Sequence, residues 1–148
     1  MGGSRARSIR KVTMPTRDYL IDNALTWSIE YLKEFDVEVD SMGVRWNRRF
    51  KTTIARATFE DSHGTIELSS KIYPSLLPLF RVRAIAHETC HIGAWALYGF
   101  DIRPHGFEWK ELMRGLGFSD PSPHADLTKK TIKKGDVWCP QKSVQRFG

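Results

Sequence analysis

The sequence predicts an α+β fold, because the period of its apolar residues changes twice along the chain. Apolar residues recur every three to four positions within residues 16–35 and again within residues 79–98. Between these segments, within residues 44–68, apolar and polar residues alternate with a period of two. Strands bracketed by helices are typical of the α+β class. A chain of 148 residues has room for one globular core of this kind.

The first predicted element is an amphipathic helix from Thr16 to about Phe35, preceded by Pro15. Its apolar residues are spaced by three and four and form one face: Leu20, Ala24, Trp27 and Tyr31. We expect the folded domain to occupy residues 14–118 and to follow a basic flexible tail at residues 1–13.

Three strands are predicted next, at residues 44–47, 53–59 and 65–68. Turn-forming residues at positions 61–64 separate the last two strands, so these two are expected to form a hairpin. We expect the three strands to make a sheet of the antiparallel type.

Two more helices are predicted after the strands. The first begins at Leu79 or Arg81, ends at Tyr98 before Gly99, and has one stripe expected to pack on the sheet: Val82, Ile85, Thr89, Ile92 and Ala96. The second extends over residues 106–116, with three candidates for inward-facing residues: Phe107, Met113 and Leu116. Residues 119–148 are expected to form a basic C-terminal tail.

The net charge of +6 is distributed in blocks. Residues 1–17, residues 41–56 and the last 21 residues are rich in Lys and Arg, whereas residues 18–40 hold seven acids and one Lys. Basic blocks can converge on nucleic acid, because each neutralised phosphate releases counterions; solvated chain segments are the simpler alternative. An aromatic ring among them can stack on a base of a single strand. The candidate contacts are Arg45, Trp46, Arg48, Arg49, Lys129, Lys130, Lys133 and Lys134.

Composition also restricts the setting of the protein. No stretch reaches 18 consecutive apolar residues, and the N-terminus lacks the apolar middle of a secretory signal. The two cysteines, Cys90 and Cys139, form at most one disulfide, which favours a reducing compartment. We therefore expect a monomeric intracellular protein, in the cytoplasm, nucleoid or nucleus, with no membrane partner.

The strongest chemical signal is the H-E-x-x-H motif at residues 87–91, which lies inside a predicted helix. Residues four apart lie on the same helix face, so the imidazoles of His87 and His91 can reach one metal ion. Glu88 lies one step round the helix, where a carboxylate can act as general base beside that ion. The alternative is a pair of ordinary helix histidines without metal.

A catalytic zinc takes three protein ligands and one water, so a third ligand must lie downstream. His105 is the first candidate, because it directly precedes the last predicted helix and Gly106 allows a close backbone approach. Glu108 and Glu111 are the alternative, carboxylate ligands. Cys90 lies inside the motif and is expected to fill the core rather than to bind the ion.

Together these motifs resemble the SprT-like, or Spartan-type, zinc metallopeptidases over residues 16–118. The matching features are Trp46-Asn47 with the strand at 53–59, the segment GTIELS at 64–69, HETCH at 87–91, and His105-Gly106 ahead of Trp109, Met113 and Gly117. The resemblance implies a minimal zincin fold, one zinc ion on His87, His91 and His105, and Glu88 as base. It also implies an endopeptidase that acts on protein substrates, including DNA-bound or DNA-crosslinked proteins during crosslink repair.

The sequence departs from the family pattern at its C-terminus. Many SprT-like proteins carry a zinc ribbon built from paired cysteines, whereas this part of the chain has only Cys139. We therefore expect an incomplete or absent ribbon, with the lysines at 129–134 as a candidate substitute for holding nucleic acid. Two alternatives to a peptidase stay open: a catalytically idle, zinc-stabilised nucleic-acid-binding module, and a structural domain without metal.

Overall fold

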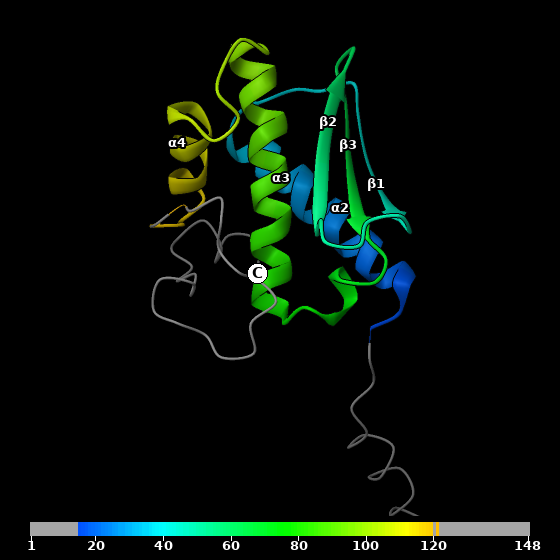
Figure 1. Cartoon of the computed structure of the whole chain (residues 1–148). Coiled ribbons are helices and arrows are strands. Elements are labelled where there is room, and N and C mark those ends of the chain that lie inside the picture. The colour runs from blue at the N-terminus through cyan, green and yellow to red at the C-terminus, as the bar shows by residue number, and fades with distance from the viewer. Residues whose placement is uncertain (1–14, 120, 122–148) are drawn as a thin grey trace, which may run out of the picture.

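The computed structural model describes residues 15–119 and residue 121. The element order is α2 (Arg17–Glu34), β1 (Ser41–Asn47), β2 (Ala55–Glu60), β3 (His63–Ser69), a 3₁₀ turn (Tyr73–Ser75), α3 (Pro78–Tyr98) and α4 (Phe107–Gly115). Figure 1 shows α3 in the middle of the molecule, between α4 and the sheet. The α+β class predicted from the sequence is confirmed. Except for Ser119 and Pro121, the expected tails lie outside the described residues, and so do Lys129, Lys130, Lys133, Lys134 and Cys139.

Helix α2 has the bounds that its periodicity predicts. The backbone N–H of Tyr19 donates to the Thr16 side-chain oxygen at 3.0 Å, so Thr16 caps the N-terminus. Past the helix end, Asp36 adopts a positive φ of 57° and turns the chain toward β1. The buried residues of α2 form a single stripe: Leu20, Ala24, Ser28, Tyr31 and Leu32.

The sheet has the order β1-β3-β2 and is mixed, so the expectation of an antiparallel sheet is wrong for one pair. Strand β2 pairs with β3 antiparallel, whereas β1 pairs with β3 parallel, with Val44 opposite Ile66. The connection at residues 48–54 is the reason, because it crosses the end of β3 and leaves β3 between β1 and β2. Phe50, 8% exposed, lies on this crossing, and its carbonyl accepts a hydrogen bond from Ser69 Oγ at 3.2 Å.

The predicted hairpin between β2 and β3 is confirmed, with a tighter turn than expected. Asp61 and Ser62 both have positive φ, 50° and 64°, which matches a two-residue turn whose twist suits a hairpin. His63 and Gly64 consequently belong to β3 rather than to the turn. The exposed His63 ring is bonded to the Ser41 side chain at 2.6 Å.

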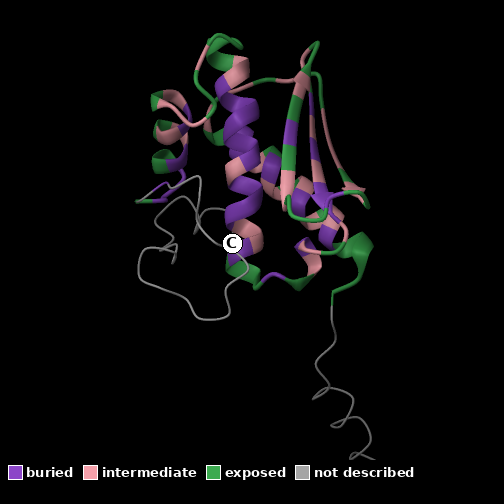
Figure 2. Cartoon of the chain, viewed as in Figure 1, coloured by how far each residue is buried: buried purple, intermediate pink, exposed green. Residues whose placement is uncertain are grey.

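Helix α3 forms the centre of the core. Pro78 occupies its first turn, where the missing N–H costs nothing, and Gly99 ends it with a φ of 83°. Figure 2 shows this helix buried along most of its length. Of the predicted stripe, Ile85, Thr89 and Ile92 are buried, and Val82 and Ala96 are partly buried. Within the described residues, no helix is long and apolar enough to cross a membrane.

Helix α4 packs on α3 through a different set of residues from the one predicted. Met113 and Leu116 are buried as expected, but Phe107 is 71% exposed and Trp109 takes the inward position with 0% exposure. Phe107 and Trp109 are two residues apart, so their side chains point about 200° away from each other on the helix. Trp109 shares its face with Met113, which excludes Phe107 from that face.

Gly93 tests how tightly the three helices pack. A Cβ at Gly93 would lie 2.8 Å from Phe35 Cδ2 and 3.3 Å from Leu112 Cδ1, whereas a Cβ at Gly115 has nothing within 4 Å. We expect Gly93→Ala to lower the free energy of unfolding by about 1 kcal/mol, because overpacking outweighs the gain in helix propensity. Gly115→Ala, the control, should be neutral or stabilising. Equal urea midpoints for the two variants would contradict this packing.

Candidate metal centre

Three histidine side chains from two parts of the chain converge on one point. His87 and His91 lie on α3, and His105 comes from the loop before α4. The Nε2 atom of His105 lies 3.1 Å from the Nε2 atom of His87 and 3.1 Å from that of His91. Among the described residues, these three side chains form a group that could hold a metal ion. Their candidate ligand atoms all lie within 4.8 Å of one another.

The geometry and the chemistry of this donor set fit a metal ion. Two nitrogen ligands of one tetrahedral zinc, each about 2.0–2.1 Å from it, lie roughly 3.3–3.4 Å apart, close to the spacing of these rings. Burial, with a smaller effect of His105, lowers the pKa of His91 to about 4. His91 is therefore neutral at pH 7 and its ring nitrogen can bind a cation. The three histidines can hold a metal ion.

Glu88 lies beside the three histidines and is 9% exposed. Its carboxylate oxygen is 3.9 Å from His87 Nε2, which exceeds a direct hydrogen bond but is within reach through one water. Burial raises the pKa of Glu88 to about 8, while a backbone hydrogen bond from Ala57 and the charge of Arg56 partly oppose that rise. The carboxylate therefore joins α3 to β2 at the site.

Two tryptophans hold the histidine rings in place, and sequence reasoning missed both roles. The Trp109 indole N–H donates to the His87 carbonyl at 3.0 Å, and its ring contacts all three histidines at centroid distances of 4.9–5.8 Å. On the other side, Trp95 stacks on His91 at 5.5 Å. The spacing gives one signal for Trp95, which lies one helical turn after His91 and shares its face.

The site opens into a cleft between α3 and β2, with a volume of about 310 Å³. The wall on β2 has small side chains at Ala55 and Ala57, which leave room beside the histidines. Strand β2 is at the edge of the described sheet, with β3 on one side only. Alternate residues along an antiparallel strand bond to the neighbouring strand. The Ile54 carbonyl accepts a hydrogen bond from Ser69 N–H at 2.8 Å, so the backbone groups of every second residue from Ile54 onward point toward β3. The backbone groups of Ala55, Ala57 and Phe59 therefore point away from β3, and the Ala57 N–H donates to the Glu88 carboxylate.

The other candidates for this site lie elsewhere. The described ligand cluster includes neither Glu108 nor Glu111, and Glu111 forms an ion pair with Arg114 at 2.7 Å. Cys90 is fully buried, as expected for a core residue. Tyr73 is buried in the core and Tyr98 is 57% exposed, and neither tyrosine lines the cleft.

The described residues among the predicted nucleic-acid contacts lie at the end of β1 and in the turn after it. Trp46, Arg48 and Arg49 line one surface depression of about 530 Å³ together with Asn47 and Glu67. Arg48 and Arg49 are exposed. Arg45 and Trp46 contact other residues of the protein. Arg45 forms an ion pair with Glu67 at 3.1 Å. The Trp46 ring packs edge-on against Tyr73 at a centroid distance of 6.1 Å, and the Arg17 guanidinium lies over it.

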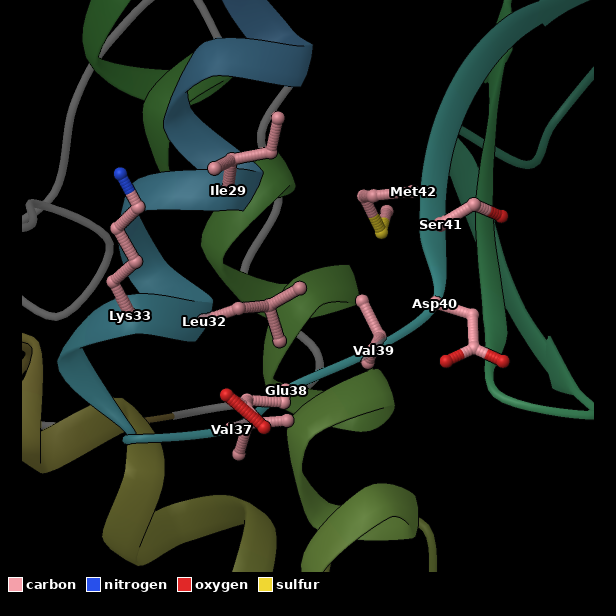
Figure 3. A pocket seen from close by; sticks show the side chains of 9 residues that line it. All are labelled: Ile29, Leu32, Lys33, Val37, Glu38, Val39, Asp40, Ser41 and Met42. Carbon is pink, nitrogen blue, oxygen red and sulfur yellow. The ribbon is translucent and has the colours of Figure 1, made fainter.

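A second cavity of about 440 Å³ lies between α2 and the chain that leads into β1. Figure 3 shows Ile29, Leu32, Val39 and Met42 around its apolar interior. It shares no lining residue with the histidine cleft. Its lining includes Lys33, Glu38 and Asp40 but no histidine or cysteine, so the metal-binding chemistry of the described residues belongs to the smaller cleft.

A helix with H-E-x-x-H, a third histidine from the following loop and a small α+β fold define a domain with a candidate single-ion metal centre. The family model described as SprT-like family matches residues 24–130. The chain therefore belongs to the SprT-like family, as its motifs predicted.

Curated relatives match at modest identity. An HMG box-containing protein of Schizosaccharomyces pombe is 27% identical over 104 residues, 64% of this chain and 28% of the relative. Protein SprT of Pseudomonas fluorescens is 30% identical over 77 residues, 51% of this chain and 47% of the relative. Protein SprT of Pseudomonas aeruginosa is 37% identical over 51 residues, 34% of this chain and 31% of the relative. The chain thus spans less than half the length of these relatives. No solved structure matches it.

Replacing His105 tests the metal centre. We expect the wild-type protein to bind one equivalent of Zn²⁺, and His105→Ala to weaken binding by more than about 100-fold, since loss of an outer partner alone costs 10- to 100-fold. The measurement is competitive titration against a chelator of known affinity. His63→Ala is the matched control, because His63 is exposed on β3 and should leave affinity unchanged. Full affinity in His105→Ala would assign the third ligand elsewhere.

Proposed function

We propose that this protein is a zinc-dependent endopeptidase of the SprT-like type. One observation carries the proposal: three imidazoles converge beside a buried carboxylate, in a cleft along the edge of β2 that no other strand of the described sheet covers. A donor set of three histidines is typical of catalytic zinc, which keeps one position for water or substrate. Membership of the SprT-like family supports the same assignment.

Zinc bound to His87, His91 and His105 supplies a Lewis acid that acidifies water and polarises a carbonyl. Glu88 takes a proton from the attacking water and delivers it to the leaving amine nitrogen as the peptide bond breaks. Its position suits this role, because its carboxylate is 3.9 Å from His87 Nε2 and the hydrogen bond from Ala57 fixes it against β2. A nearby dication also favours the ionised carboxylate that a base requires.

We infer that the substrate is an extended peptide that pairs with β2. The Ala57 N–H donates to Glu88, but the backbone groups of Ala55 and the carbonyl of Ala57 can hydrogen-bond such a segment, as in other cases of strand addition. Their small side chains let its backbone come close to the histidines. An extended segment exposes its peptide bonds to the zinc, whereas a helix or a folded sheet does not. Locally unfolded segments of proteins, including proteins attached to DNA, are therefore the proposed substrates.

The Glu88→Gln variant tests the peptidase against the idle-module alternative. Gln keeps the size of the side chain and removes the base, so we expect zinc binding to persist and cleavage of an unfolded protein to fall about 10²- to 10⁴-fold. Glu111→Gln on α4 is the control and should retain full activity. Cleavage would be followed with and without single-stranded DNA. Undiminished proteolysis by Glu88→Gln would overturn the mechanism.

We further propose that single-stranded nucleic acid contacts the turn after β1. The exposed side chains of Arg48 and Arg49 support this proposal, since they lie in one depression with Trp46. Arg45 already forms an ion pair with Glu67, so we expect it to contribute less to nucleic-acid affinity than Arg48 and Arg49. The basic residues at 129–134 are the second proposed contact.

Salt dependence tests this contact. The affinity for a single-stranded oligonucleotide should fall as salt increases, and the Arg48→Ala/Arg49→Ala double variant should lower the slope of log affinity against log salt by about 1.4, or about 0.7 for each lost phosphate contact. The Lys110→Ala/Arg114→Ala double variant on α4 removes the same charge and should leave the slope unchanged. Equal slopes in all three proteins would exclude the turn as a binding site.

A further inference from the structure

We propose that Phe59, Trp95 and Phe100 form an apolar subsite that selects a large apolar side chain of the peptide substrate. The inference rests on the proposed peptidase function and adds a sequence preference to it. The three rings come from β2, α3 and the loop after α3, and Trp95 also lines the histidine cleft.

The contacts among the rings define the subsite. The Phe100 ring lies 5.7 Å from the Trp95 ring and 6.2 Å from the Phe59 ring, measured between centroids and in tilted geometry. Phe100 is 63% exposed, an unusual state for a phenylalanine that already has two aromatic neighbours. An incoming apolar side chain can cover this exposed surface, and removal of apolar surface from water favours its binding.

Gly99 places Phe100 in this position. The Gly99 N–H donates to the Trp95 carbonyl at 2.8 Å, and its φ of 83° is in the left-handed region that glycine adopts without strain. The chain therefore leaves α3 with a sharp turn, and the next side chain folds back over Trp95. A residue with a Cβ at position 99 would strain this turn.

The subsite is continuous with the metal centre. Trp95 lines the histidine cleft and stacks on His91, so one ring contacts both a metal ligand and Phe100. On β2, Phe59 follows the cleft residue Ala57 by two positions, and both side chains pack with the core on the same face of the strand. Two strand residues extend about 6.6–6.8 Å. The selected side chain therefore belongs to a peptide residue about two positions from the cleaved bond.

The occupant is a side chain of an extended peptide, because the geometry restricts what reaches the rings. The edge of β2 at Ala55 and the Ala57 carbonyl can guide a strand along the cleft, and alternate side chains of that strand point the same way. The three rings carry no charge, and the neighbouring cleft wall at Pro104 is also apolar. Phe, Leu, Met and Trp match this surface better than Asp, Glu or Lys.

Cleavage-site profiling tests the subsite. A library of peptides from an unfolded proteome is digested with zinc-loaded wild-type protein, and the cleaved bonds are identified by mass spectrometry. We expect large apolar residues to be enriched at one position about two residues from the cut. On a matched pair of peptides with Phe or Ala there, kcat/KM should favour Phe by about tenfold, the lower end for an apolar pocket.

Variants separate the subsite from general stability. Phe100→Ser should reduce the tenfold preference to less than about twofold while zinc content and the unfolding midpoint stay unchanged, and Phe100→Leu should retain most of the preference. Tyr19→Ser removes another exposed aromatic side chain, on α2, and should leave the preference intact. A wild-type profile without an apolar preference, or an unchanged preference in Phe100→Ser, would overturn the subsite.

A binding measurement distinguishes failure of the subsite from failure of the proposed function. Zinc-loaded Glu88→Gln should bind the Phe peptide about tenfold more tightly than the Ala peptide, and adding Phe100→Ser should remove the difference. If this difference is present but no protein cleaves peptides, the peptidase proposal fails and the apolar site stands. If Glu88-dependent cleavage occurs and the two peptides bind equally, the peptidase stands and the subsite is wrong.

Discussion

The burial of α3 is the constraint on which the rest of the structure depends. This helix contacts α2, the sheet and α4, so polar side chains on it need partners inside the protein. His87, Glu88 and His91 are such side chains, and each finds its partners on a different element. Trp109 of α4 bonds the His87 carbonyl, Ala57 of β2 bonds the Glu88 carboxylate, and His105 approaches both ring nitrogens. The packing that buries the helix therefore also builds the site.

Burial favours the uncharged forms of two side chains at the site, and for His91 this is the form that binds a cation. Without a metal ion, the raised pKa of Glu88 and the lowered pKa of His91 both favour the uncharged side chains at neutral pH. A neutral imidazole is the form that binds metal, so His91 needs no deprotonation. A dication held by the three rings would lower the pKa of the adjacent carboxyl and favour its charged form. In the mechanism that we propose, metal binding would thus supply the ionised Glu88 that acts as base.

Small residues and aromatic residues lie at different sides of the cleft. Ala55 and Ala57 keep the strand edge open beside the histidines, whereas Trp95 closes one side against His91. Trp109 fills the space behind the three rings and is fully buried. The open cleft fits the extended peptide that we propose as the substrate.

The sequence by itself determined the elements and the chemical type of the site. Hydrophobic periodicity located the helices and the hairpin, and the i, i+4 spacing placed His87 and His91 on one face, because these patterns are local. For the third ligand, the sequence offered three candidates and favoured His105 over Glu108 and Glu111. Only the tertiary structure shows that His105 joins the cluster and that the two glutamates do not. The parallel pairing of β1, the inward position of Trp109 in place of Phe107, and the contact of Phe59 with Phe100 also arose only on folding. Each depends on which distant elements become neighbours, and local spacing carries no information about that.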